Sequence, residues 1–180
     1  MKTAQEKQQE TFDALKGDFE YENPMEAPHL EKIVISTGIG SITDKTKIDL
    51  IPDRLAQITG QQPKPTQAKK SIASFKSRQG DVIGYQVTLR GERMRSFFDK
   101  LIHIVFPRTK DFRGIDRNTI DEMGNITIGI SEHTAFPEAS DEELRNVFGL
   151  AVTIVISAPN REVAEAYLEH LGIPFKKKEE

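Results

Sequence analysis

The sequence contains no cysteine. Without that residue the chain can form neither a disulfide framework nor a thiolate site, which fits a reducing compartment. No apolar run approaches the roughly 20 residues that cross a bilayer, and residues 1–6 lack the apolar core of a secretory signal. We therefore expect a cytoplasmic protein with no membrane partner.

Patterns of catalysis and metal binding are missing too. The four histidines stand apart, without the paired spacing of metal ligands: His29, His103, His133 and His170. The segment 37–41 has glycines like those of a phosphate loop, but it lacks the dinucleotide fingerprint and the Gly-Lys-Ser/Thr of a P-loop. A turn after a strand explains those glycines. The sequence thus predicts no enzyme, no metal site and no cofactor.

The composition is that of an ordinary globular protein. Apolar residues make up 37% and charged residues 29% of the 180 positions, which excludes a disordered chain. With no internal repeat and no linker, residues 1–180 are expected to form a single domain. Residues 1–28 are expected to be peripheral, with a short helix ended by Gly17, and residues 176–180 to form a solvated tail.

Four segments alternate apolar and polar residues with the period of a β-strand: 32–36, 83–90, 125–131 and 151–157. In the second segment Ile83, Tyr85, Val87 and Leu89 are expected to face a core, while the residues between them face outward. Such strands form a sheet with one covered face and one open face, as antiparallel sheets commonly do.

Helical periodicity marks the elements that cover this sheet. Apolar residues follow the i, i+3, i+4 rule across 94–105 and across 51–58, the latter ended near Gly60. Asn160 can cap a helix that stops at Gly172, and Ser140 or Asp141 can start a short helix through Val147. We predict an α+β two-layer sandwich, a mostly antiparallel sheet with helices on one face and the other face open.

Charge is segregated along the chain. Residues 64–113 hold twelve Lys and Arg against four Asp and Glu, a local net charge of +8. The whole chain carries −3, so the remaining residues sum to −11. Screening beyond about 8–10 Å lets a local patch act almost on its own. The basic segment therefore indicates an anionic partner, although a pI of about 5.9 is low for a nucleic-acid binder.

The outward positions of the predicted strands are small or hydrogen-bonding: Lys32, Ser36, Gly84, Gln86, Thr88, Arg90, Thr127, Gly129, Ser131 and Thr153. Such side chains suit phosphate, ribose and base edges, although strand propensity alone also favours Ser and Thr on a solvated face. The basic hairpin loop 68–80 surrounds Phe75 with four cations: Lys69, Lys70, Lys76 and Arg78. A ring among cations suits an RNA loop; the alternative is a solvated hairpin with Phe75 in the core.

Specific motifs follow one another along the chain. The central run is Thr66-x-Ala68-x-Lys70-Ser71-x-Ala73-x-Phe75-Lys76-x-Arg78-x-Gly80, then Ile83-Gly84 and Val87-Thr88-Leu89-Arg90-Gly91-Glu92-Arg93-Met94. Matches outside it include Gly38-Ile39-Gly40, Phe136-Pro137-Glu138 and Pro174-Phe175. Over nearly the whole chain this ordered set resembles the family of the universal large-subunit ribosomal protein number five, of the bacterial type, which binds 5S rRNA in the central protuberance.

The resemblance implies a structural protein that makes and breaks no bond. It implies as partners 5S rRNA, large-subunit rRNA, P-site tRNA, neighbouring 5S-binding ribosomal proteins and, across an intersubunit bridge, a small-subunit head protein. The candidate rRNA-binding residues are carried over from the family position by position, together with two lysines of the basic loop: Lys32, Ser36, Gln61, Lys69, Lys70, Phe75, Gln86, Thr88 and Arg90. The family's hairpin tip reaches tRNA, which implies a contact at Ser74, Lys76, Ser77, Arg78, Gln79 and Gly80.

The chain departs from the family pattern mainly in charge. Members usually have Asn at the position of Ser36, and basic residues near Met123 and at Ser131. Most members are also basic overall, whereas this chain is acidic.

An alternative interpretation is an acidic-surface protein-interaction module with no direct RNA role. In that case neutralising Glu20, Glu22 and Glu26 would abolish partner binding and leave RNA affinity unchanged. The RNA hypothesis predicts instead that changing Lys32 or Arg90 lowers the affinity for RNA.

Overall fold

The structure is a computed structural model of the chain, and it describes residues 3–40, 42, 44–75, 77–110, 112–140 and 146–176. The side chain of Phe75 lies outside this description, as does all of Lys76. The helix start expected at Ser140 or Asp141 runs into residues 141–145, which also lie outside it, as do residues 177–180 of the expected tail.

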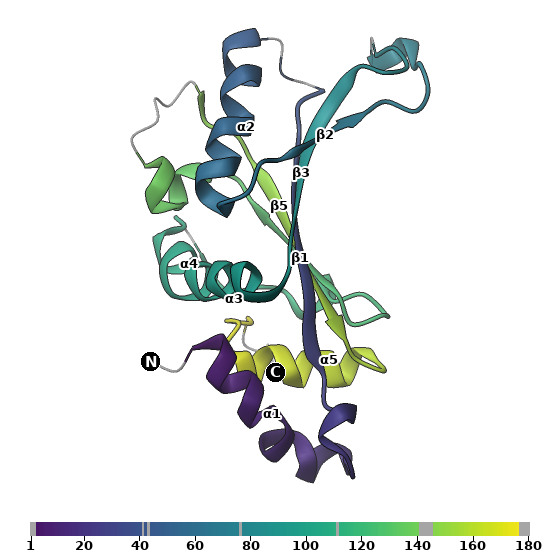
Figure 1. Ribbon diagram of the computed structural model, residues 1–180, viewed down its shortest axis with the longest axis vertical. Helices are drawn as coiled ribbons and strands as arrows, with labels where there is room; N and C mark the ends of the chain where they lie inside the picture. The colour runs from purple at the N-terminus through teal and green to yellow at the C-terminus, as the bar shows by residue number, and fades with distance from the viewer. Residues whose placement is uncertain are drawn as a thin grey trace. The chain divides into compact units, whose positions relative to one another are not determined.

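Five strands form one antiparallel sheet, which confirms the α+β prediction (Figure 1). The strands are β1 (His29–Gly38), β2 (Lys64–Gln67), β3 (Val82–Leu89), β4 (Ile126–Ile130) and β5 (Leu150–Ser157), in the order β2-β3-β1-β5-β4. In β4 and β5 every second residue is buried, as the alternation predicts. In β1, Ile33 and Ile35 are fully buried while Lys32, Val34 and Ser36 stay half-exposed.

The helical elements follow the predicted apolar stripes in most places. They are α1 (Ala4–Phe19), η1 (Pro24–Glu26), α2 (Lys45–Thr59), η2 (Ala73–Phe75), α3 (Gly91–Lys100), η3 (Leu101–Val105), α4 (Phe106–Arg108), η4 (Arg117–Thr119), η5 (His133–Ala135), η6 (Pro137–Ala139) and α5 (Arg161–Leu171). The segment η3 is a π-helical turn, which carries one extra residue per turn and continues α3 into α4.

The chain divides into two compact units. Unit 1 comprises Met1–Ile33, Arg90–Ile128 and Thr153–Glu180, and unit 2 comprises Val34–Leu89 and Gly129–Val152. Strands β1, β4 and β5 each contribute residues to both units. The single domain expected for residues 1–180 stays a prediction.

In unit 1, α1 is fastened to α3 and α5. The backbone N–H of Ala4 donates to Asp99 Oδ1 at 2.8 Å, and Lys7 Nζ donates to the carbonyl oxygen of Leu171 at 2.6 Å. Figure 1 shows α1 beside α5. The predicted limits of α5 are confirmed, because Asn160 Oδ1 accepts from the N–H of Val163 at 2.9 Å and the helix ends at Gly172.

The N-terminal helix is longer than predicted. α1 has 16 residues and passes through Gly17, which keeps a helical backbone. It ends where Glu20 takes the left-handed conformation (φ 52°), a position that favours glycine. The short helix ended by Gly17 was therefore wrong, because a glycine inside a docked helix costs only about 1 kcal/mol.

In unit 2, α2 buries the predicted stripe of Ile51, Leu55 and Ile58. Asp44 caps its start by accepting from the N–H of Thr46 at 3.0 Å, and Gly60 ends it with a left-handed backbone (φ 67°). The turn at Gly60 places Gln61, the next residue, beside β3.

Candidate nucleic-acid interface

Gln61 and Thr88, two predicted rRNA-binding residues, meet in unit 2. Gln61 follows the turn at Gly60, and its Nε2 donates to the backbone oxygen of Thr88 in β3 at 3.3 Å. The hydroxyl of Thr59 holds the same turn by donating to the backbone oxygen of Gln61 at 3.0 Å. The amide of the half-exposed Gln61 and the hydroxyl-bearing, exposed residue Thr88 thus lie together, where they can bind ribose or a base edge.

Two further predicted residues occupy half-exposed positions on neighbouring strands of unit 2. Ser36 lies in β1 and Gln86 lies in β3, opposite Lys64 of β2. In unit 1, the outward positions Thr127 and Thr153 pair through their hydroxyls at 3.0 Å. The outward-facing pattern expected of β4 and β5 is therefore present, and these two hydroxyls satisfy each other.

Arg90 stands at the start of α3 in unit 1. Its Nη1 lies 3.5 Å from Glu31 Oε1 and 3.5 Å from the backbone oxygen of Glu31. The two side chains are 58% and 46% exposed, and a solvated ion pair of this length contributes about 0–1 kcal/mol. A phosphate group can therefore replace Glu31 as the partner of Arg90 at little cost.

The loop between β2 and β3 is a hairpin, as predicted, and it extends past the paired parts of these strands (Figure 1). Two backbone hydrogen bonds join Ile72 and Ser77 across it, at 3.0 and 3.3 Å. Ser77 is half-buried, whereas the other described residues predicted to contact tRNA are exposed: Ser74, Arg78, Gln79 and Gly80. The predicted roles of Lys76 and of the Phe75 ring lie outside the described residues.

Several predicted RNA-binding cations have no ion-pair partner among the described residues: Lys32, Lys69, Lys70 and Arg78. Lys69, Lys70 and Arg78 are exposed, and Lys32 is half-exposed. Cations without an internal partner lose nothing within the protein when they bind phosphate, and they release counterions when they do so.

A groove of about 790 Å³ lies beside the hairpin in unit 2, and the sequence analysis did not foresee it. Lys69 and Lys70 line it together with Ile72, Val82 and Ile83, which are 45%, 40% and 40% exposed. Isolated aliphatic residues in a basic loop were the signal that could have revealed it. An apolar floor beside two cations can hold a flat ring whose attached anion meets the lysines.

Two expectations for β3 were wrong. Ile83 is 40% exposed, although it was expected to face a core with Val87 and Leu89, which are buried. Gly84 was expected on the open face, yet it is buried. A Cβ atom at Gly84 would lie 2.6 Å from the carbonyl oxygen of Thr37, so this glycine serves the close approach of its own neighbouring strand and not that of a partner.

The structure offers no metal centre in the part of the chain that it describes, where no three His, Cys, Asp or Glu residues gather. Among the same residues, no helix is long and apolar enough to cross a membrane.

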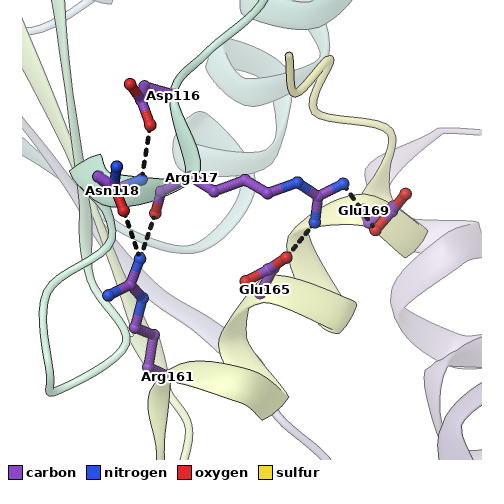
Figure 2. Close-up of polar contacts among 6 residues, drawn as sticks. All are labelled: Asp116, Arg117, Asn118, Arg161, Glu165 and Glu169. Atoms are coloured by element: carbon purple, nitrogen blue, oxygen red, sulfur yellow. Dashed lines mark hydrogen bonds and ion pairs between the residues drawn. The ribbon is translucent and has the colours of Figure 1, made fainter. Parts of the chain in front are cut away.

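A polar cluster in unit 1 fastens η4 to α5 (Figure 2). Arg117 pairs with Glu165 and lies 3.6 Å from Glu169, and Arg161 Nη2 donates to the backbone oxygen of Arg117 at 3.0 Å. The hydrogen bond that Arg117 donates to Glu165 raises the pKa of Arg117, and the carboxylate charges of Glu165 and Glu169 act in the same direction. Because Arg117 forms ion pairs with Glu165 and Glu169, we interpret it as a structural residue, unlike the unpaired cations Lys32, Lys69, Lys70 and Arg78.

Comparisons with known proteins agree along the chain. A family model described as ribosomal protein L5 matches residues 23–78, and a second model, described as the C-terminus of the same ribosomal family, matches residues 82–175. A large ribosomal subunit protein uL5 of Anaeromyxobacter sp. (strain K) is 48% identical over 157 residues, 87% of each chain. Proteins of the same name are 46% identical over 170 residues in Roseiflexus castenholzii, covering 94% of each chain, and in Trichlorobacter lovleyi, covering 94% of this chain and 95% of the relative.

Proposed function

Because this chain belongs to the ribosomal protein L5 family, we propose that it binds 5S rRNA within the large ribosomal subunit. The family is structural, so the chain is a non-catalytic constituent of the large subunit and works in the cytoplasm on the ribosome. The observation that carries the proposal is the set of unpaired cations on a chain whose other charges are mostly acidic.

Each unit contributes its own kind of contact to the proposed rRNA binding. In unit 2, Gln61 and Thr88 offer an amide and a hydroxyl in one place, and Ser36 and Gln86 offer two more polar groups on neighbouring strands. These groups suit ribose 2′-hydroxyls and base edges. In unit 1, Lys32 and Arg90 would neutralise phosphates.

The groove beside the hairpin extends the proposal to unpaired nucleotides. An unstacked base laid on Ile72, Val82 and Ile83 would cover apolar surface that is now exposed to water. Its phosphates would then lie within reach of Lys69 and Lys70. The groove therefore favours a single-stranded loop of rRNA over a continuous helix.

The proposed function also includes a tRNA contact at the hairpin tip and an intersubunit bridge to the small subunit. Ser74, Ser77, Arg78, Gln79 and Gly80 would contact P-site tRNA, together with Lys76 from outside the described residues. The ring of Phe75, which also lies outside them, stays a proposed rRNA contact. Neighbouring 5S-binding proteins and a small-subunit head protein are the proposed protein partners, in keeping with the family.

Salt titration of binding to 5S rRNA tests the proposal at Lys32 and Arg90. A plot of log affinity against log salt has a negative slope, and each removed phosphate contact reduces its magnitude by about one unit. We expect that reduction for Lys32→Ala and for Arg90→Ala. Lys16→Ala, which changes a cation on the acidic N-terminal helix of the same unit, should leave the slope unchanged.

Two results would contradict the proposal. One is the absence of binding at about 0.1 M salt, where the Debye length is roughly 10 Å. The other is an equal slope for all three variants, which would mean that attraction between net charges accounts for the binding and that Lys32 and Arg90 contact no particular phosphate.

A further inference from the structure

A separate groove of about 360 Å³ lies in unit 1 between α1 and η1. We call it the α1–η1 groove, and its apolar lining consists of Phe12, Pro24, Met25, Ala27 and Pro28. Met25 is 87% exposed, the highest value among the exposed large apolar side chains that the structure describes. Methionine is flexible and polarizable, which suits it to packing against a partner side chain.

The walls of the α1–η1 groove are held in place without a partner. Besides the bonds of Ala4 and Lys7 to α3 and to the end of α5, His170 Nε2 lies 2.9 Å from the carbonyl oxygen of Lys7. The η1 turn has a capping box between Asn23 and Glu26, and Asn23 Oδ1 also accepts from the N–H of Met25 at 3.0 Å. A preformed groove binds its partner with little loss of conformational entropy.

The chain segment that forms most of the groove is strongly acidic, and acidic residues stand close in sequence to its lining: Asp13 follows Phe12, and Glu26 follows Met25. Residues 1–28 hold seven Asp and Glu against three Lys. Four carboxylates of this segment have no ion pair among the described residues: Asp13, Asp18, Glu20 and Glu22. Such a surface repels polynucleotides and attracts cations.

We propose that the α1–η1 groove docks a basic segment of another protein, one aliphatic side chain of which packs against Met25. Lys or Arg residues of that segment face the carboxylates of α1, and Lys16, with its Nζ 5.2 Å from the centroid of the Phe12 ring, already shows a cation held on this face. Two copies of this chain, each with net charge −3, repel each other, so a partner of opposite charge is favoured over a second copy.

The test uses the full-length chain and fluorescein-labelled peptides in fluorescence anisotropy. The probe is Lys-Lys-Leu-Lys-Leu-Lys-Lys, and its matched controls replace both leucines by serine or all lysines by glutamate. We expect the leucine-containing basic peptide to bind most tightly. Met25→Ser should weaken it about tenfold or more, since burial of a methionine contributes about 1.5–3 kcal/mol. Met123→Ser, which changes another exposed methionine of unit 1, should leave the affinity unchanged.

Four outcomes would overturn the proposal. Equal binding to Met25→Ser and to the unmodified chain would exclude the groove, and equal binding of the leucine and serine peptides would leave only attraction between charges. A lower affinity of Met25→Ser for 5S rRNA would make the groove an RNA site. A dimer that sedimentation equilibrium detects and that Met25→Ser abolishes would make a second copy the occupant. The affinity of Met25→Ser for 5S rRNA should equal that of the unmodified chain, so this test and that of rRNA binding fail independently.

Discussion

Two strand glycines of unit 2 have opposite surroundings. A Cβ atom at Gly84 would lie 2.6 Å from the carbonyl oxygen of Thr37 and 3.0 Å from Thr66 Oγ1. At Gly129 in β4 nothing lies within 4 Å of the same atom. Both glycines read alike in the sequence, as small outward positions, and only the distance to the neighbouring strand separates them.

This difference predicts the cost of adding one methyl group. Gly84→Ala should lower the free energy of unfolding by about 1–3 kcal/mol, because the backbone of β1 or β3 must shift. Gly129→Ala should change it by no more than about 0.5 kcal/mol. Urea unfolding monitored by circular dichroism measures both, and equal midpoints for the two variants would show that β1 accommodates the methyl group.

At the scale of elements, the hairpin between β2 and β3 has a backbone fixed by hydrogen bonds and side chains that are exposed to solvent. The Ile72–Ser77 bridge and the hydrogen bond from the N–H of Gly80 to the oxygen of Ala68, at 3.0 Å, close it in two places. Asp81 Oδ2 accepts from the N–H of Arg78 at 2.7 Å and fixes the backbone there. The guanidinium of Arg78 is thereby presented to a partner from a defined turn.

The proposed tRNA contact predicts a kinetic effect for this side chain. In ribosomes that carry Arg78→Ala, P-site tRNA should dissociate about fivefold faster, since a charge-assisted contact at an exposed site contributes about 1 kcal/mol. Lys64→Ala, an exposed change in β2 away from the tip, is the matched control. An unchanged rate in ribosomes with normal 5S rRNA content would exclude the contact.

Elements with local signals were predictable from the sequence, and those that depend on distant contacts were not. Asn160 and Gly172 mark both ends of α5 with residues next to the helix. In contrast, α1 continues through Gly17 because its docking on α3 and α5 outweighs a weak local signal. The pairing of Arg117 with Glu165 joins residues 48 positions apart, which no local pattern reveals.

The candidate site divides in the same way. Alternation indicated that Lys32, Ser36 and Thr88 face outward, and they are exposed or half-exposed. The hydrogen bond of Gln61 to β3 could not be predicted, because it spans 27 positions and depends on the turn after α2. The groove beside the hairpin also requires the fold, since its lining comes from the hairpin, from the segment that follows β1 and from α2.

For the whole molecule, the decisive property is the distribution of charge. The +8 of residues 64–113 and the −11 of the remainder coexist in one chain. In the N-terminal segment, four carboxylates have no ion pair among the described residues: Asp13, Asp18, Glu20 and Glu22. An acidic surface opposes adventitious contacts with RNA, so it restricts a polyanion to the basic residues.

Neutralising that acidic surface should therefore reduce the selectivity of the chain for 5S rRNA over other RNA. The quadruple change Asp13→Asn, Asp18→Asn, Glu20→Gln and Glu22→Gln should raise the affinity for poly(U) severalfold at about 0.1 M salt, where repulsion acts over roughly 10 Å. Affinity for 5S rRNA should change less. Filter binding with both RNAs measures the ratio, and a constant ratio would show that the acidic residues play no part in selectivity.

The edge strand β2 has a consequence for the chain before assembly. It is four residues long, begins with Lys64, and contains Pro65, which has no N–H to offer. Exposed sheet edges recruit strands of other copies, and shortness, lysine and proline are the features that prevent this. Pairing of free copies through this edge is thus disfavoured, so we expect the chain to resist fibrous aggregation that starts at β2.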